Sequence, residues 1–274
     1  MEDAKNFEVT EDVRQSPEYA KYIQSIGWQV VKINNINIFL RNFFLGLRIA
    51  KIQRTKGDIP WNKVFTILKN EKVFSLRYEP LVIEKPAGFG YSSWPLLGTK
   101  TLRINLRPGE IEIFNSFKKD CRYALRKSFV SNPKIIFNKF DDFYNIWREE
   151  ARRKSLWIPG IKEYKSLLNC FGKKAFCITY KNIAGAVILM HRKTAFYYYS
   201  ACLPAGKKMQ LPYFLVWSAM KEAKNGGCTV WDFEGINDDR WPNEGWKGFS
   251  HFKKSFGGKE IIFPGSFQKW LWPR

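Results

Sequence analysis

A lysine lies inside an aromatic segment near the end of the chain. Two phenylalanines and two lysines fall within five residues, from Phe252 to Phe256, and a Gly-Gly pair follows. A lysine beside a ring, such as Lys253, holds its charge against apolar surface, where less water competes for it. The plainer alternative is a packed helix from which the lysine only reaches out to solvent. This segment is the first candidate for chemistry.

Other signatures of catalysis are weak. The sequence has no G-x-S-x-G nucleophile elbow and no P-loop, and the G-x-G that begins at Gly88 lacks the helical pattern of a dinucleotide site. The stretch WDFEGINDD, Trp231 to Asp239, carries four acidic residues after an expected strand. A metal site is one interpretation, but acidic loops are common and we favour an ordinary loop. Only two histidines occur, which disfavours a His-rich metal site or a Ser-His triad.

The composition indicates a large folded core. The 274 residues are 45% hydrophobic and 17% aromatic, which excludes a disordered chain. A net charge of +21 is compatible with a plain basic protein or with an anionic partner: nucleic acid, a phosphorylated substrate or an acidic membrane surface. Five cysteines without a C-x-x-C pair suit a reducing cytosol.

The sequence shows no targeting signal that we can identify. Its acidic, polar N-terminus does not resemble a signal peptide. The longest apolar region, Ile36 to Ile52, is interrupted by three basic residues and falls short of the ~18 uncharged residues of a spanning helix. We expect a cytoplasmic protein, with contact to the inner face of the membrane left open.

The first half reads as a helix, a meander of strands, a second helix and a further strand. Ser16-Pro17 begins the first helix, and the second begins near Pro60. The strand KVFSLRYEPLVI follows, with Glu79-Pro80 at its end, and TLRINL closes this half. Pro108-Gly109 is the expected domain boundary.

The second half repeats this order at greater length. Ile113 to Phe129 is the clearest helix, with one apolar and one basic face. Two helices, three strands, a helix from Pro212, and a strand follow. A loop from Glu234 to Gly248 then leads to a short helix that holds Phe252 and Lys253, and a last strand follows. Both halves fit a sheet with helices on its faces, an α/β (α+β) fold.

Five motifs in order resemble the Fem family (FemABX) of peptidoglycan peptidyltransferases. The end, DFEGI…GFSHFKKSFGGKEIIFPGSFQKWL, resembles the family's strand ending in D-[LF]-x-G, its F-K-x-x-F segment and its closing strand. SPEYAKYIQSIGWQV resembles the opening helix, and LRYEP resembles an L-R-[IF]-D-P strand. FKKDCRYALRKSFVSNPKIIF and AFYYYSA resemble the basic helix and the aromatic strand of the second domain. The resemblance covers nearly the whole chain.

The resemblance implies two tandem GNAT-like (acyl-CoA N-acyltransferase-like) domains with mixed sheets flanked by helices. Residues 1–107, completed by 265–274, form the first domain, and residues 108–264 form the second, which carries the Phe-Lys motif. The implied reaction transfers an amino acid from aminoacyl-tRNA to an amine of a peptidoglycan precursor, nucleotide- or lipid-linked. No cofactor is implied, and we expect a monomer.

The resemblance also implies roles for single residues. Phe252 provides a wall, and the Lys253 charge stabilises the tetrahedral oxyanion formed when an amine attacks an ester. Glu79 stands where the family has Asp and is either a general base or part of a turn with Pro80; we favour the turn. Gly160 stands where the family has an arginine that binds substrate. The substrate-binding candidates are Lys21, Tyr164, Tyr197 and Tyr199.

Tyr197 and Tyr199 alternate along one strand, so we expect them to share a face.

Contacts with tRNA are assigned to the basic helix and to two tryptophans. The tRNA-binding candidates, for phosphates and for stacking on an unpaired end, are Lys118, Lys119, Arg122, Arg126, Lys127, Trp241 and Trp246.

Two other functions remain open at this point. One keeps the fold and uses an acyl-CoA donor such as acetyl-CoA. That class carries a glycine-rich turn for the pyrophosphate, and LPAGKKMQ, Leu203 to Gln210, has one glycine only in that place. The other is a non-catalytic RNA-binding protein, for which Lys253→Ala would leave RNA binding intact.

Overall fold

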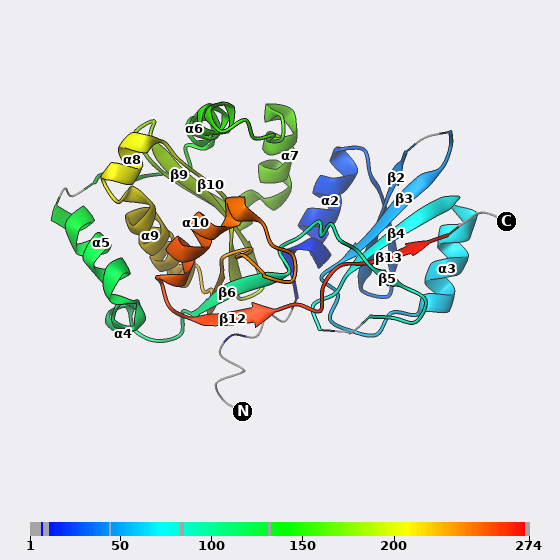
Figure 1. The fold of residues 1–274 in the computed structure, drawn as a ribbon. Helices are drawn as coiled ribbons and strands as arrows, with labels where there is room; N and C mark the ends of the chain where they lie inside the picture. The colour runs from blue at the N-terminus through cyan, green and yellow to red at the C-terminus, as the bar shows by residue number, and fades with distance from the viewer. Residues whose placement is uncertain (1–6, 8–10, 44, 83–84, 131–132, 272–274) are drawn as a thin grey trace. The chain divides into compact units, whose positions relative to one another are not determined.

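The computed structural model describes residues 7, 11–43, 45–82, 85–130 and 133–271. These residues form two compact units, each built around one β-sheet (Figure 1). Unit 1 and unit 2 are both discontinuous in sequence. Unit 1 comprises Met1–Val9, Thr101–Ile236 and Glu244–Ile261, and unit 2 comprises Thr10–Lys100, Asn237–Asn243 and Ile262–Arg274. The last three residues of the expected 265–274 completion lie outside the described residues.

Unit 2 holds a six-stranded sheet with the order β1-β2-β3-β4-β13-β5. Asn34 adopts a φ of 53° in the tight turn between β1 and β2, a conformation that asparagine tolerates. Helix α3 then carries the chain across so that β4 pairs with β3 in parallel. Its elements are η1 (Val13–Gln15), α2 (Pro17–Ser25), β1 (Gln29–Ile33), β2 (Ile36–Asn42), β3 (Arg48–Gln53), α3 (Trp61–Asn70), β4 (Val73–Glu79), β5 (Gly90–Tyr91) and β13 (Phe267–Trp270).

Unit 1 holds a seven-stranded sheet with the order β12-β6-β11-β10-β9-β8-β7. Strands β7 to β10 form an antiparallel meander, and β10 pairs with β11 in parallel after a helical crossover. Its elements are β6 (Lys100–Asn105), α4 (Glu110–Ser116), α5 (Lys119–Val130), β7 (Ile136–Phe137), α6 (Phe140–Arg153), α7 (Ile161–Phe171), η2 (Gly172–Lys174), β8 (Ala175–Tyr180), β9 (Ala184–His191), β10 (Thr194–Cys202), α8 (Pro204–Lys208), α9 (Leu211–Asn225), β11 (Val230–Asp232), α10 (Glu244–Lys254) and β12 (Lys259–Ile262).

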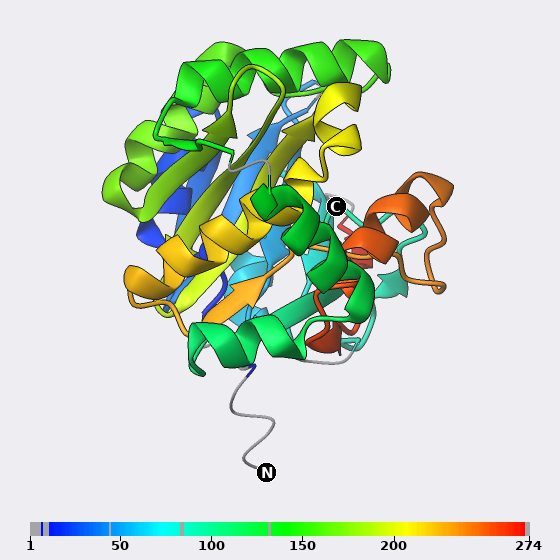
Figure 2. The same cartoon turned by 90° about the vertical axis from the view of Figure 1, so that its left-hand side faces the viewer.

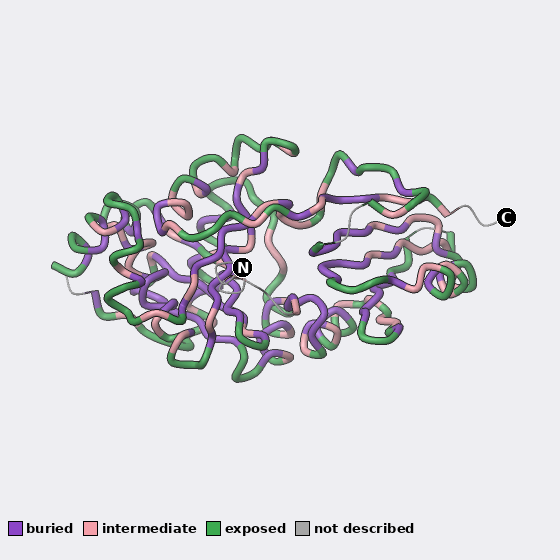
Figure 3. The backbone as a smooth tube through the Cα atoms, turned by 90° about the horizontal axis from the view of Figure 1, so that it is seen from below, coloured by how far each residue is buried: buried purple, intermediate pink, exposed green. Residues whose placement is uncertain are grey.

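Helices cover both faces of the seven-stranded sheet. Helices α6 and α7 lie over one face, and α9 lies over the other with α5 outside it (Figure 2). The buried residues run along the central strands of each sheet (Figure 3). In the described part of the chain, no helix combines the length and apolar character needed to cross a bilayer.

The predicted helix from Ile113 to Phe129 is wrong as one element. The chain breaks at Phe117, whose ψ of 150° is extended, and the structure has two helices, α4 and α5. The break is stabilised by the Lys118 amide, which donates to the carbonyl of Ser255 at 2.9 Å. The apolar pattern continues across the break because Ile113, Phe117 and Cys121 are all buried, so periodicity alone did not reveal it. The predicted loop to Gly248 is also too long, since α10 begins at Glu244.

Strand β6 decides where unit 1 begins. It pairs antiparallel with β11, and Arg103 lies opposite Asp232. This ladder places residues from Thr101 onward in unit 1, whereas the turn at Pro108-Gly109 follows the strand. A turn signal marks the end of a strand and does not tell which sheet the strand joins.

Candidate active site

A pocket of about 720 Å³ opens in unit 1 where the parallel strands β10 and β11 part. The two strands pair over only three residues, from Thr194 to Phe196 in β10. Beyond Phe196, β10 continues to Cys202 with its edge toward β11 unpaired by that strand, and residues from this edge line the pocket. Carboxyl ends of parallel strands are the usual place for a ligand in such sheets.

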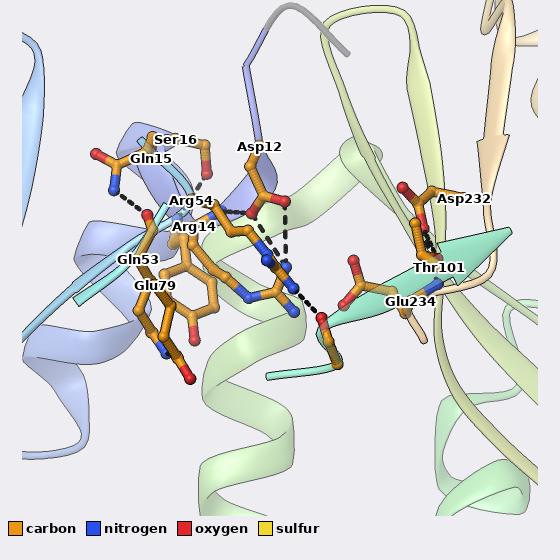
Figure 4. Close-up of polar contacts among 12 residues, drawn as sticks. Asp12, Arg14, Gln15, Ser16, Gln53, Arg54, Glu79, Thr101, Asp232 and Glu234 are labelled. Carbon is orange, nitrogen blue, oxygen red and sulfur yellow. Dashed lines mark hydrogen bonds and ion pairs between the residues drawn. The ribbon is translucent and has the colours of Figure 1, made fainter. Parts of the chain in front are cut away.

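Asp232, the last residue of β11, is fixed by an ion pair and by hydrogen bonds. Arg103 Nε lies 2.7 Å from one carboxylate oxygen. The Thr101 hydroxyl donates to the other oxygen at 2.6 Å (Figure 4). Burial alone would raise the pKa of Asp232, but the charge of Arg103 and these hydrogen bonds outweigh it and lower the pKa. The carboxylate is thus charged, buried and already paired with protein groups, which makes it an anchor for the following turn.

The motif D-F-E-G, Asp232 to Gly235, forms a turn that presents two carbonyls. The Asp232 carboxylate accepts from the Glu234 amide at 2.9 Å, and Glu234 adopts a φ of 62°. Gly235 has a φ of 141°, which favours glycine. The carbonyl oxygens of Phe233 and Gly235 both accept from Lys253 Nζ, at 2.8 and 2.7 Å. The motif therefore positions the lysine.

Lys253 holds its ammonium group at the pocket wall. Its Nζ lies 4.7 Å from the centroid of Phe249 and 6.0 Å from that of Tyr197. Burial lowers the pKa of Lys253 to about 8, although the nearby charges of Glu234 and Asp232 act to raise it. Two of its three N–H groups are taken by carbonyls, which leaves one for a ligand.

Helix α10 orients this lysine through its aromatic neighbours. Phe252 packs edge-on against Tyr213 at 4.9 Å, and Phe256 is fully buried. Phe252 in α10 and Phe256 in the turn after it pack edge-on at 5.4 Å, which fixes the end of α10 on the core beside Lys253. Gly258 follows with a φ of 80°, and a Cβ there would lie 2.3 Å from the carbonyl oxygen of Arg103. Only glycine fits this close approach between the end of α10 and β6.

The two candidate tyrosines of β10 do not share a face, so that prediction is wrong. The register against β9 shifts between Tyr197 and Tyr199, which marks a bulge at Tyr198. A bulge adds one residue and reverses the alternation. Tyr197 therefore packs against Phe233 at 5.8 Å and lines the pocket, whereas Tyr199 packs against Trp147 of α6 at 4.2 Å.

Glu150 of α6 lines the same pocket, and the sequence pattern did not single it out. Its side chain is buried, and one oxygen accepts from the Cys202 amide at 2.7 Å. The other oxygen lies 2.6 Å from Lys154 Nζ. A signal was present in the sequence, since Glu150 falls four residues after the buried Ile146 on the inner face of α6. An acidic residue at an apolar position of an amphipathic helix indicates a buried role.

The remaining predicted substrate residues lie elsewhere. Tyr164 is 1% exposed, packs 5.2 Å from Tyr144, and its hydroxyl donates to the Phe140 carbonyl at 3.1 Å. It is a core residue of the α6–α7 layer and does not line the pocket. Lys21 is exposed on α2 of unit 2.

Glu79 ends β4 in unit 2 and has hydrogen bonds to both oxygens. It accepts from the amides of Leu96 and Leu97, at 2.6 and 3.3 Å, and from Gln53 Nε2 at 2.9 Å. Figure 4 shows the Gln53 and Glu79 side chains beside each other. The side chain is buried, so its hydrogen bonds tie residues 96–97 to the sheet.

Some of the residues predicted to bind tRNA are exposed to solvent, and others make contacts within the protein. Lys118, Lys119, Arg126 and Lys127 are exposed. Arg122 instead donates to the carbonyls of Asn115 and Phe117 at the end of α4. The two tryptophans belong to different units. Trp246 packs against Phe249 of α10 in unit 1, and Trp241 donates through Nε1 to the Ser92 carbonyl in unit 2, at 2.9 Å.

Residues 179–273, which include β9 to β13, match the FemAB family. No curated protein matches the sequence. Within the described residues, no group of three histidine, cysteine or acidic side chains is arranged to hold a metal ion.

Solved structures share the fold over nearly the whole chain. FemX is similar with a TM-score of 0.79 at 14% identity, over 98% of this chain and 95% of that one. The C-terminal domain of a putative lysylphosphatidylglycerol synthetase from Agrobacterium fabrum has a TM-score of 0.60 at 12% identity, over 93% and 87%. A tandem GNAT protein from the clavulanic acid pathway has a TM-score of 0.52 at 9% identity, over 89% and 82%. The predicted fold class, mixed sheets flanked by helices in a GNAT-like arrangement, is confirmed.

Proposed function

We propose that the chain is a Fem-type transferase that moves an amino acid from aminoacyl-tRNA to an amine of a peptidoglycan precursor, a proposal supported by the FemAB match over residues 179–273 and by the fold shared with FemX. The observation that carries the proposal is the Lys253 ammonium, held by two carbonyls at the wall of a 720 Å³ pocket. A pocket of this size lies in the range of small-molecule sites.

The proposed chemistry needs one fixed positive charge. The amine nitrogen attacks the ester carbonyl carbon, a C–N bond forms, and the carbonyl oxygen becomes an oxyanion. The remaining N–H of Lys253 donates to that oxygen in a partly dry site, where a charge acts more strongly than in water. When the C–O bond breaks, the 3′-oxygen of the tRNA leaves and takes a proton released by the amine.

The protein's own rings and carbonyls keep the lysine in place during this step. Phe249 and Tyr197 shield the ammonium, and the carbonyls of Phe233 and Gly235 prevent it from turning away. No cofactor enters the proposal, since the charged tRNA already brings an activated ester. We propose that the exposed cations of α5, with Lys118 before it, contact tRNA phosphates, and that Lys21 contacts the diphosphate of the precursor.

In the segment where acyl-CoA-dependent enzymes carry a glycine-rich turn for the pyrophosphate, the one glycine of this chain makes a packing contact. Gly206, the glycine of LPAGKKMQ, is buried, and a Cβ there would lie 2.8 Å from Cys202 Sγ. Its lack of a side chain thus serves close packing of α8 on β10. This use of the glycine favours the aminoacyl-tRNA donor over acyl-CoA.

A donor screen tests the proposed function. Purified protein is incubated with muropeptide precursors and either a set of charged tRNAs or acetyl-CoA, and the precursors are weighed by mass spectrometry. We expect a mass gain of one amino-acid residue with charged tRNA. A gain with acetyl-CoA alone would replace the proposal with an acyl-CoA-dependent transferase. Salt-sensitive RNA binding without any transfer would support a non-catalytic RNA-binding protein.

A further inference from the structure

The pocket of unit 1 contains charges of both signs. Among its described lining residues, Glu150 is the one carboxylate, and three lysines accompany it: Lys154, Lys207 and Lys253. Glu150 is buried, and a buried carboxylate is stable only when a hydrogen-bond donor or a positive charge lies beside it.

The carboxylate of Glu150 is fixed at the open edge of β10. The Leu203 amide donates to Ile183 at 2.8 Å, on the side of β9. Successive amides of a strand point to opposite sides, so the Cys202 amide faces the edge that β11 leaves unpaired. Glu150 accepts from that amide at 2.7 Å. The same hydrogen bond therefore gives the Cys202 amide, at the open strand edge, its acceptor and holds the carboxylate at the pocket.

The lysines that now contact Glu150 can move away. Lys154 Nζ lies 2.6 Å from its second oxygen and Lys207 Nζ lies 4.0 Å away, yet their side chains are 41% and 53% exposed. Because the two ammonium groups remain accessible to water, pairing with the buried Glu150 holds these long side chains less firmly than a fully buried pair would. A ligand ammonium entering the pocket can replace them at small cost, and both lysines then return to water.

Tyr197 lines the pocket together with Glu150 and Lys253. Its ring lies 6.0 Å from Lys253 Nζ, and burial raises the pKa of its phenol, with a smaller contribution from the charge of Glu150. A positive group of a ligand is attracted by Glu150 once Lys154 and Lys207 have turned to solvent, and a negative oxygen of the ligand is attracted by Lys253. The pocket therefore offers one partner for each sign of charge.

We propose that Glu150 binds the ammonium group of the aminoacyl donor, so that the carbonyl oxygen of the donor turns toward Lys253. This inference rests on the proposed function and deepens it: the donor is selected for a cationic amine near its ester. Glu150 is then a residue that determines specificity. An acyl group without the amine lacks a partner for this carboxylate.

Binding of donor mimics tests the inference apart from any transfer. The probes are 3′-aminoacylamido-3′-deoxyadenosine, whose amide does not transfer, and the matching hydroxyacyl compound. They are titrated calorimetrically at about pH 6.5, where the α-amine is protonated. We expect the wild type to bind the amine compound roughly 10- to 100-fold more tightly, the range for a hydrogen bond to a charged group.

Three variants distinguish recognition of the ligand ammonium by Glu150 from the hydrogen bond by which Glu150 supports the edge of β10. Glu150→Gln keeps an acceptor for the Cys202 amide and removes the charge, so we expect both compounds to bind equally. Glu149→Gln removes an exposed carboxylate from the same helix and should keep the preference. Lys154→Met removes the competing lysine and should strengthen binding of the amine compound alone.

Defined outcomes would overturn the inference. These are a wild type without preference, a Glu150→Gln variant that keeps it, a Glu149→Gln variant that loses it equally, or a Lys154→Met variant that binds both compounds as before. Lys154→Met keeps the test valid if Glu150→Gln fails to fold. Transfer from charged tRNA is scored separately, so failure of the proposed function and failure of this inference give different results.

Discussion

The two units share a strand pattern and differ at the end of their parallel strands. In each, an antiparallel meander leads to a strand that pairs in parallel after a helical crossover: β3 with β4 in unit 2, and β10 with β11 in unit 1. In unit 2 the ladder runs to Gln53 opposite Glu79, and the Arg54 amide extends it by donating to the Glu79 carbonyl at 2.6 Å. In unit 1 it stops at Phe196.

The length of the parallel ladder determines whether the strand ends of each unit are available to a ligand. In unit 2 the ladder continues, and the carboxylate at its end, that of Glu79, accepts hydrogen bonds from the backbone amides of residues 96–97. Where it stops early, strand edges and carbonyls remain for a ligand and for Lys253. Changes at the open end of unit 1 should therefore alter the rate of transfer, and changes at the closed end of unit 2 should alter stability.

The largest expected effect is that of Lys253→Ala on transfer. Loss of one preorganised oxyanion donor should lower kcat by roughly 100- to 1,000-fold, as measured by single-turnover transfer from charged tRNA. The control is Lys254→Ala, which removes the adjacent lysine and its ion pair with Glu260. Equal rates for the two variants would remove Lys253 from the reaction.

At the closed end of unit 2, Glu79→Ala should act on folding instead. The substitution leaves the amides of Leu96 and Leu97 and the side chain of Gln53 without their acceptor. We expect the free energy of unfolding, measured by urea titration, to fall by about 1–3 kcal/mol. The transfer rate of the folded fraction should change far less than in Lys253→Ala. A large loss of rate at unchanged stability would instead make Glu79 the general base.

The pH profile tests the charge of Lys253. Its pKa is lowered by burial to about 8, so the ammonium is present below that pH and is lost above it. We expect kcat to fall about tenfold per pH unit above about 8, the slope for loss of one proton. The contribution of this group to stability has the opposite sign: above about 8 the unfolded chain binds the extra proton, so stability from Lys253 rises with pH up to the lysine value of 10.5. A rate that stays constant to about pH 10 would contradict this assignment.

The smallest effect concerns the basic surface of unit 1. Replacing Lys119 and Lys127, both exposed on α5, by glutamine should weaken tRNA binding a few-fold and reduce the slope of log affinity against log salt by about 2. The matched control replaces Lys63 and Lys69, exposed on α3 of unit 2. Identical losses from both pairs would indicate an effect of net charge only.

The order of elements was accessible from the sequence, because it depends on local apolar periods and turn residues. The break at Phe117 was not, since the residue is buried on the same face as its neighbours and the cause is a distant carbonyl, that of Ser255. The bulge at Tyr198 escaped for a related reason: one inserted residue leaves no trace in an all-aromatic run. The break depends on a carbonyl far away in sequence, and the bulge depends on the register against β9.

At the candidate site, local motifs were informative and long-range ones were not. Phe252, Lys253 and the D-F-E-G turn lie close in sequence, and the hydrogen bonds from Lys253 to the carbonyls of Phe233 and Gly235 join two parts of one motif. Glu150 reaches Cys202 across 52 residues, and its pairing depends on how far β11 follows β10. No periodicity within α6 carries that information.

Strand β13 makes unit 2 depend on a segment that is far from most of that unit in sequence. It lies between β4 and β5 in the sheet of unit 2, although residues 267–270 follow every segment of unit 1. A purified chain truncated after residue 261 therefore keeps every segment of unit 1 and lacks one inner strand of unit 2. Such a chain should resist protease in unit 1 and be cut in unit 2, and equal resistance of both units would refute this dependence.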